Sequence, residues 1–271
     1  MENVCCNLCG LDDTVLWGNK AGIDIVKCRN CGLIYCNPRP DNSELQKFYS
    51  EEYFIEGHYE EDFLRQRMYE IEIDEIVKRI GRQGRFLDVG CAVGKFLQTL
   101  PDTFEKWGTE FSEDAARMGR DKFNLNIISG QVRDAPLPLN YFDVVQMRGV
   151  LEHSQNPYED LTKIRMVLKD SGLLRISQLP NIGGISARLF KTRFNQVKPG
   201  EHLYYFTPKT LKLMLDKTGF RIVSIDYPYL NTPYASLIKD IFSMFACFFN
   251  NKTTPPFFRN MMIVYADKKE K

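Results

Sequence analysis

The stretch that most constrains the fold is residues 85–95, which combine an apolar run with a glycine-bearing turn. Residues 86–89 predict a short buried strand, and residues 95–100 predict a helix that follows it directly. Gly90 and Gly94 permit a tight turn between them and let a ligand approach the backbone closely, next to the unpaired N–H groups of the helix start. An ordinary α/β turn would fit this stretch taken alone, but the downstream pattern argues against it.

Strand-like and helix-like segments alternate through the rest of the chain, which predicts a parallel sheet. Ser112 and Asn156 are expected helix N-caps, and Ser171 with Gly172 is expected to turn into the following strand. Strands are expected at residues 85–89, 106–110, 126–129, 141–147, 173–179, 221–226 and 261–266. Residues 85–271 therefore predict an α/β fold, a Rossmann-like seven-stranded, mostly parallel sheet with helices on both faces.

Two copies of the pattern C-x-x-C-G lie near the N-terminus, with eighteen residues between Cys9 of the first and Cys28 of the second. Two residues between the cysteines let both thiolates face one ion, and four thiolates complete a tetrahedral, structural zinc site. The predicted ligands are Cys6, Cys9, Cys28 and Cys31, with Cys5 as an alternative to Cys6. Eight cysteines without a secretion signal favour metal ligands or free thiols over disulfides. Four surface thiols are the competing interpretation.

The segments before the sheet predict a small domain and a bridge. Residues 1–40 are expected to form a zinc ribbon that needs its metal to fold, with a hairpin whose turn lies near residues 18–20. Residues 41–84 are expected to form a helical bridge or lid, with helices over 44–49 and 60–80. Its aromatic residues either pack the domains together or cover a ligand, namely Tyr49, Tyr53, Phe54 and Tyr59.

An acidic residue, Glu110, ends the second predicted strand, 22 residues after Asp88. A carboxylate there can accept both hydroxyls of a ribose, as in dinucleotide-binding folds. The turn is not G-x-G-x-x-G, however, because Ala92 and Lys95 occupy two of its positions. A nucleoside ligand without phosphates fits this pattern better than a dinucleotide, and S-adenosylmethionine is the commonest one.

At this point the chain resembles the class I S-adenosylmethionine-dependent methyltransferases, in a form that carries an N-terminal zinc ribbon. The resemblance covers nearly the whole chain, and Ala92 departs from it where the family usually has glycine. It rests on residues 87–94, 108–112, 142–153, 156–174, 178–181 and 202–208.

The resemblance implies a role for each matching residue. Asp88 would reach the methionine amino group, Glu110 would bind the ribose, and Phe111 would lie beside the adenine. Gln131 replaces the usual acid and would accept from the adenine amino group. The implied cofactor-binding residues are Asp88, Gly90, Cys91, Gly94, Glu110, Phe111, Gln131, Val132 (through its N–H) and Arg148 (through its carbonyl).

Methyl transfer to oxygen or carbon also needs a base. The chain has three histidines, and His58 is expected to be solvated. His153 follows the fourth strand, where the resemblance implies a residue facing the methyl group; the competing interpretation is that it ties the loop to Glu152 or to the backbone. His202 is the second catalytic candidate.

The acceptor is expected to be a small molecule, such as a sugar, a nucleotide sugar or another biosynthetic intermediate. Residues 181–206 and 228–260 interrupt the alternating pattern and are the expected substrate-side insertions. Four cations in the first insertion would suit a phosphorylated or acidic acceptor, although a solvated charged face explains them equally: Arg188, Lys191, Arg193 and Lys198.

Overall charge argues against polyanionic partners, because 36 basic residues face 35 acidic ones. The longest mostly apolar run, residues 241–249, is about half the length that spans a bilayer, and the N-terminus has no signal-peptide pattern. A cytoplasmic protein is expected, with no nucleic-acid partner and no membrane span. The alternatives are a methyltransferase that modifies RNA or protein, and a non-catalytic cofactor-binding protein with the same fold.

Overall fold

The structure, a computed structural model, describes residues 1–49, 63–255 and 257–270. A seven-stranded sheet forms its centre, in the order β10-β11-β8-β7-β4-β5-β6, with β11 antiparallel to both neighbours and the remaining pairs parallel. All seven predicted strands are present: β4 (Gly84–Val89), β5 (Phe104–Glu110), β6 (Asn126–Ser129), β7 (Phe142–Arg148), β8 (Leu168–Pro180), β10 (Phe220–Asp226) and β11 (Met261–Lys268). The chain moves outward from β4 to β6 and returns through β7, so a crevice opens at the carboxyl ends of β4 and β7.

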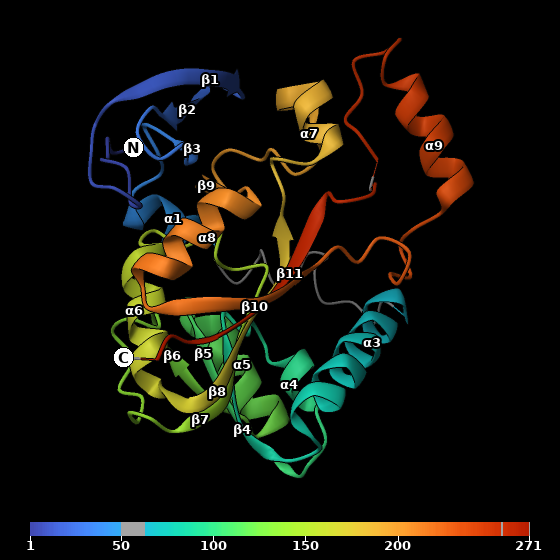
Figure 1. Cartoon of the computed structure of the whole chain (residues 1–271). Helices are drawn as coiled ribbons and strands as arrows, with labels where there is room; N and C mark the ends of the chain where they lie inside the picture. The colour runs from blue at the N-terminus through green and yellow to red at the C-terminus, as the bar shows by residue number, and fades with distance from the viewer. Residues whose placement is uncertain (50–62, 256, 271) are drawn as a thin grey trace.

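Helices cover both faces of this sheet, as predicted (Figure 1). Phe86 packs in the core with α3 (Phe63–Ile80), α4 (Lys95–Thr99) and α5 (Glu113–Phe123). The next residue, Leu87, packs in the opposite core with α6 (Pro157–Val167) and α8 (Pro208–Lys217). Successive strand residues point to opposite faces, so the apolar run at 86–89 supplies both cores.

The predicted helix caps are confirmed. The Ser112 hydroxyl accepts from the Ala115 N–H and the Asn156 side chain from the Glu159 N–H. β8 begins at Leu168, directly after α6, rather than at the predicted Leu173, and Ser171 and Gly172 lie within it, just before its regular pairing with β7 starts at Leu173. The extra residues are taken up as an irregularity in the pairing of β7 with β8.

A second, four-stranded sheet has the order β1-β2-β3-β9 and contains β1 (Thr14–Lys20), β2 (Ile23–Cys28), β3 (Ile34–Cys36) and β9 (Tyr204–Tyr205). The hairpin turn lies at Ala21 and Gly22, whose φ angles are 53° and 79°, directly after residues 18–20, near which it was predicted. Two adjacent residues with positive φ form the turn that suits a two-residue hairpin. β9 joins this sheet from a segment distant in sequence, and a two-residue strand leaves no pattern from which to predict it.

The remaining helices are α1 (Asn42–Phe48), α7 (Ile185–Phe190) and α9 (Leu237–Ala246), with a 3-10 turn at Lys191–Arg193. α1 and α3 are the described parts of the predicted bridge. Its residues Tyr53, Phe54, His58 and Tyr59 lie outside the described residues. Among the helices of the described ranges, none has the length and apolar character required to cross a membrane.

Candidate functional site

A cavity of about 250 Å³ opens at the carboxyl ends of β4, β5 and β7. Most of the predicted site residues line it, namely Asp88, Gly90, Cys91, Glu110, Phe111, Gln131, Val132, Arg148 and His153. Gly94 and His202 lie outside this lining. Gly94 begins α4 with a φ of 79°, and a Cβ there would collide with Leu125, so the glycine serves the turn and the packing beneath it.

Three consecutive N–H groups of the turn, those of Gly90, Cys91 and Ala92, are already hydrogen-bonded within the protein. Those of Gly90 and Cys91 donate to the Thr109 carbonyl at 2.7 and 3.0 Å. The Ala92 N–H donates to Glu110 Oε2 at 2.8 Å. A phosphate needs such donors, so this turn fits a ligand that brings donors of its own.

Glu110 is buried, and each of its carboxylate oxygens already accepts one N–H group. Oε1 accepts from the Ser112 N–H at 2.9 Å, and Oε2 accepts from Ala92. Burial raises the pKa of Glu110, and the N–H donors of Ser112 and Ala92 oppose this rise. Each oxygen keeps lone-pair capacity for a further donor, so the residue is equipped to accept a pair of ribose hydroxyls.

Asp88 forms the floor of the cavity at the end of β4. Burial raises its carboxyl pKa from 3.8 to about 7, against the hydrogen bond from Gln146 Nε2 at 3.2 Å. Arg148, Glu72 and Arg175 are the other charged groups that act on it. An acid held in this way favours an ammonium ligand, whose charge would stabilise the ionised form.

This raised pKa predicts a pH-dependent affinity for S-adenosylmethionine. Below about pH 7, Asp88 must lose a proton before it can pair with the ammonium, so the affinity should rise by up to about tenfold per pH unit between roughly pH 6 and 7 and then level off. Calorimetry in buffers of different ionisation enthalpy would detect the released proton. Asp88→Asn should flatten the profile, and a wild-type affinity that is constant from pH 6 to 8 would contradict the prediction.

A buried ionic network supports the floor of the cavity. Glu72 on α3 is 1% exposed and lies 2.9 Å from Arg175 Nη1 and 3.2 Å from Arg148 Nε. It also accepts from Gln178 Nε2 at 3.0 Å. Burial alone would raise the pKa of Glu72, but Arg148 and Arg175 outweigh this effect and lower it. The Arg148 side chain is therefore engaged by Glu72 at the edge of the cavity.

Two further lining residues, Gln131 and Cys91, differ in the groups that they offer a ligand. Gln131 Nε2 donates to Gln155 Oε1 at 3.3 Å, which leaves the Gln131 oxygen to accept from a ligand. Cys91 is buried, and this burial is the main reason why the pKa of its thiol is raised well above the ordinary value. Cys91 is consequently a small lining residue and not a reactive thiol.

Sequence reasoning missed several lining residues from the helices that cover the cavity. Leu45 on α1 and Arg65 and Tyr69 on α3 line it, as do Gln155 and Asp160 beyond β7. Tyr49, predicted either to pack or to cover a ligand, also lines it. The helical period of α3 indicates that one face is buried but not which part of that face meets the cavity.

His153 and His202 lie next to each other, with ring centroids 4.7 Å apart. His153 Nδ1 is 2.9 Å from the Glu201 carbonyl and 3.0 Å from the Tyr49 hydroxyl. Burial lowers the pKa of His153 to about 4 and that of His202 well below its ordinary value. Both imidazoles are therefore neutral near pH 7. His153 thus makes the hydrogen bond to the backbone that the competing interpretation predicted, and it also lines the cavity.

The four predicted cations of the first insertion do not act as one group. Arg193 donates to the carbonyls of Cys247 and Asn250 at 2.9 and 2.6 Å, and Lys198 pairs with Glu201. Arg188 and Lys191 are exposed, and none of the four lines the cavity.

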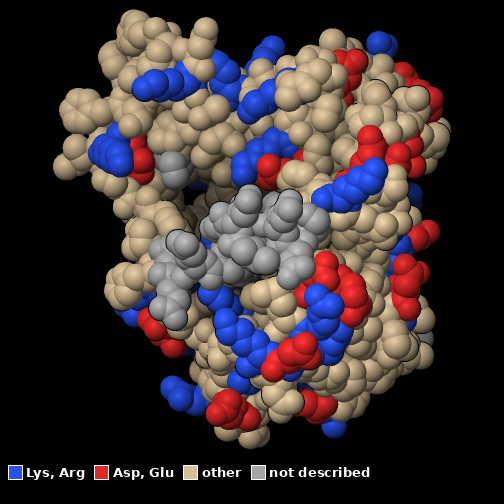
Figure 2. Space-filling view, turned by 180° about the vertical axis from the view of Figure 1, so that it is seen from behind, with Lys and Arg blue, Asp and Glu red and all other residues tan. Residues whose placement is uncertain are grey.

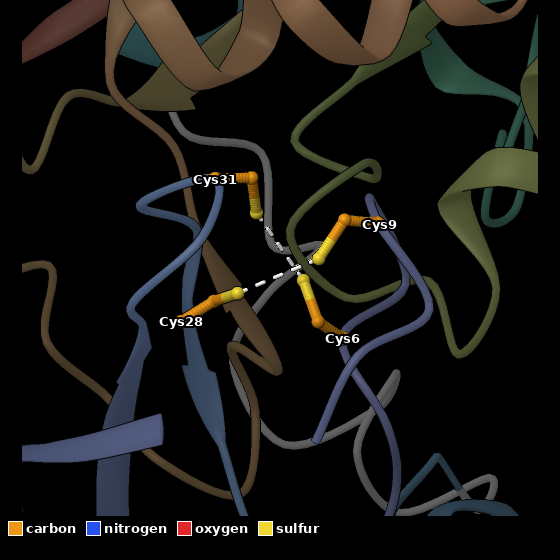
Figure 3. A group of neighbouring side chains, drawn as sticks. All are labelled: Cys6, Cys9, Cys28 and Cys31. Atoms are coloured by element: carbon orange, nitrogen blue, oxygen red, sulfur yellow. Dashed lines mark hydrogen bonds between the residues drawn. The ribbon is translucent and has the colours of Figure 1, made fainter. Parts of the chain in front are cut away.

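The predicted zinc ligands converge on one point (Figure 3). Their Sγ atoms all lie within 4.8 Å of one another, and the cluster consists of Cys6, Cys9, Cys28 and Cys31. Cys5, the alternative ligand, is exposed and outside this group. Four cysteine sulfurs facing one point match the donor set of a closed, structural zinc site.

Comparison with known proteins places this geometry in a family. A family model described as a methyltransferase domain matches residues 62–225. The tRNA U34 carboxymethyltransferase of Aeromonas salmonicida is 29% identical over 154 residues, which cover 52% of this chain and 46% of that protein. The ubiquinone/menaquinone biosynthesis C-methyltransferase of Paraburkholderia xenovorans is 27% identical over 161 residues, which cover 50% of this chain and 66% of that protein. The chain thus spans less than two thirds of either relative's length.

A solved structure shows the same fold. Magnesium protoporphyrin IX methyltransferase from Synechocystis, crystallised with bound SAH, matches 84% of this chain and 100% of its own, with a TM-score of 0.58 and 15% identity. The family model covers more than half of the present sequence. The chain therefore belongs to the family of methyltransferase domains.

Proposed function

We propose that this chain transfers the methyl group of S-adenosylmethionine to a small-molecule acceptor, a biosynthetic intermediate such as a sugar or a nucleotide sugar. One observation carries the choice of cofactor. The turn N–H groups of Gly90, Cys91 and Ala92 are already used, whereas the carboxylates of Asp88 and Glu110 line the cavity. A ligand with an ammonium group and two ribose hydroxyls fits this surplus of acceptors, and a pyrophosphate does not.

When bound, the cofactor supplies a methyl group activated by its sulfonium. The protein's part is to orient the two reactants in line and to exclude water. Leu45, Tyr49 and Tyr69 close the cavity from α1 and α3, while Asp88 and Glu110 fix the two ends of the nucleoside portion. His153, in the cavity wall, and the adjacent His202 belong in this proposal to the acceptor half of the site.

The proposal also assigns a role to the N-terminal segment. Residues 1–40 form a ribbon that binds zinc through Cys6, Cys9, Cys28 and Cys31, residues 41–84 form a bridge and lid, and residues 85–271 form the catalytic domain. The zinc is structural, because four protein ligands leave no open position. The protein acts in the cytoplasm.

Two features support a small acceptor. A second cavity of about 190 Å³ is lined from both predicted insertions, by Gln196, Tyr229 and Phe257 among others, and Arg259 in its lining would suit an acidic or phosphorylated group. The face shown in Figure 2 carries interspersed basic and acidic side chains, in line with the formal net charge of +1, whereas a nucleic-acid-binding surface is expected to be basic.

Glu110→Gln tests the cofactor assignment. The substitution removes the charge that accepts the ribose hydroxyls, and hydrogen bonds to a charged group contribute about 1.5–3 kcal/mol each. The affinity for S-adenosylmethionine, measured by calorimetry, should therefore fall by about 100-fold or more. Glu113→Gln, which changes an exposed carboxylate on the next helix, should bind like the wild type, and thermal unfolding would verify that both variants are folded.

The alternatives predict other outcomes of the same measurements. A wild-type protein that binds neither S-adenosylmethionine nor its demethylated product would contradict the proposal. Binding without methylation of any acceptor would indicate a non-catalytic protein. A strongly salt-dependent affinity for tRNA would favour an RNA acceptor.

A further inference from the structure

Three potential metal ligands meet beside the cofactor cavity, apart from the cysteine cluster. Donor atoms of Glu152, His153 and His202 all lie within 4.8 Å of one another. The first two follow β7, and the third lies just before β9. Backbone hydrogen bonds join these segments, because the N–H groups of Leu203 and Tyr204 donate to the Glu152 carbonyl at 2.8 and 3.1 Å.

Both imidazoles are held by backbone carbonyls. His153 Nδ1 lies 2.9 Å from the Glu201 carbonyl, and His202 Nδ1 lies 2.8 Å from the Gln196 carbonyl. A carbonyl can only accept, so each Nδ1 carries a proton, and Nε2 is the ring nitrogen that a metal ion would bind. Metal-binding histidines are oriented in this way, with the second ring nitrogen donating to a carbonyl or a carboxylate.

The carboxylate of Glu152 is buried and incompletely paired. The residue is 3% exposed, and its Oε2 atom has no hydrogen-bond partner among the described residues. The other oxygen, Oε1, lies 3.8 Å from His153 Nε2, too far for a hydrogen bond. An unpaired carboxylate oxygen in a buried position is costly, and a cation would supply the missing partner.

We propose that Glu152, His153 and His202 bind a divalent transition-metal ion. Two neutral imidazoles and one carboxylate form the ligand set of several catalytic zinc sites and of non-haem iron sites, which leave positions open for substrate. Imidazole donors favour Zn²⁺, Co²⁺ or Fe²⁺ over Mg²⁺, which prefers oxygen. The cysteine cluster differs in chemistry, because it offers only sulfur.

The position of the cluster suggests the class of acceptor, an inference that rests on the proposed function. His153 lines the cofactor cavity, and Gln196, whose carbonyl holds His202, lines the second cavity. A metal ion here would bind an acceptor oxygen and lower the pKa of its hydroxyl. The hydroxyl proton would pass to solvent, and the oxygen would bond to the methyl carbon as the carbon–sulfur bond breaks and the sulfonium becomes a thioether. The acceptor class is therefore a hydroxyl compound able to ligate a metal.

Cobalt titration of the full-length protein, with zinc already in the cysteine cluster, tests the site. We expect one additional equivalent of Co²⁺ to bind, with the weak visible absorption of nitrogen and oxygen ligands and without intense thiolate charge-transfer bands. Glu152→Gln should weaken this binding by about 100-fold or more. Loss of a residue that only orients a metal ligand costs about 10–100-fold in affinity, and loss of a ligand should cost at least as much. Glu201→Gln is the matched control, because its carboxylate pairs with Lys198 on the surface.

A second variant, at another proposed ligand, tests the site independently in case Glu152→Gln fails to fold. In His202→Asn, the amide can still donate to the Gln196 carbonyl, but the free nitrogen that would bind the metal is lost. Retained zinc in the cysteine cluster and a melting temperature close to that of the wild type would show that each variant is folded.

The absence of an additional cobalt equivalent, thiolate bands for that equivalent, or an unchanged affinity in both variants would overturn the metal site. None of these results depends on whether the cofactor binds, so failure of the metal site and failure of the proposed function are distinguishable.

Discussion

Replacing Cys28 by serine is expected to weaken zinc binding severely and to lower the free energy of unfolding by about 5 kcal/mol or more. Cys28 is fully buried in the cysteine cluster, at the end of β2. Structural zinc contributes about 10–16 kcal/mol to the folding of small zinc-finger peptides, and three remaining thiolates recover only part of this. The melting temperature should fall by roughly 10–20 °C for a chain of this size.

The loss should extend beyond the ribbon, because its sheet continues into a distant segment. β3 pairs with β9 through Ile34 with Tyr205 and Tyr35 with Tyr204, so a disordered ribbon would release the backbone beside His202. Metal analysis and thermal unfolding would test the effect. Cys5→Ser is the matched control, because Cys5 is exposed and outside the cluster. Equal zinc content and equal melting temperatures in the two variants would show that the cluster does not hold a structural zinc ion.

Glu72→Ala is expected to destabilise the fold by about 3–5 kcal/mol, because it leaves the buried Arg175 without its counter-charge and removes the partner of Arg148. Glu72 lies 2.9 Å from Arg175, which is fully buried, and 3.2 Å from Arg148. The loss should also disturb the floor of the cofactor cavity, since Arg148 lines it. Denaturant unfolding would measure the change in stability.

The control for this substitution lies on the same helix. Glu70 is exposed and pairs with Arg67 on the surface, an interaction that contributes at most about 1 kcal/mol. Glu70→Ala should therefore be nearly neutral. If Glu72→Ala destabilised the protein no more than Glu70→Ala, the buried network would not support the fold in the way described.

Much of the fold was predictable because its signals are local. The apolar run at residues 86–89 indicates a strand buried on both faces, and Ser112 and Asn156 cap their helices by bonding N–H groups three residues ahead. β8 begins earlier than predicted, at Leu168, and residues 169–172 lie between its paired residues Leu168 and Leu173, where the register with β7 shifts. This early pair depends on the neighbouring strand, so the sequence does not indicate it.

The candidate site was predictable where it depends on the ends of parallel strands. Asp88 and Glu110 end adjacent strands, and the carboxyl ends of parallel neighbours meet at one edge of the sheet. Tyr69 and Glu72 were not predicted, because the place where α3 crosses the sheet edge depends on packing. The two histidines were predicted as separate candidates, and the structure brings them together with Glu152.

The sequence alone is enough to predict the strand–turn–helix unit at residues 85–95, the alternation that builds the sheet, the two cysteine pairs and the acids at the strand ends. Each of these is specified by spacing within a few residues or by the shared direction of parallel strands. The three-dimensional fold is needed to show that β9 completes the ribbon sheet, that Glu72 pairs with the buried Arg175 and the partly exposed Arg148, and that His202 lies close to Glu152 and His153. These contacts join segments far apart in the chain through backbone hydrogen bonds and the pairing of buried charges, neither of which leaves a periodic pattern in the sequence.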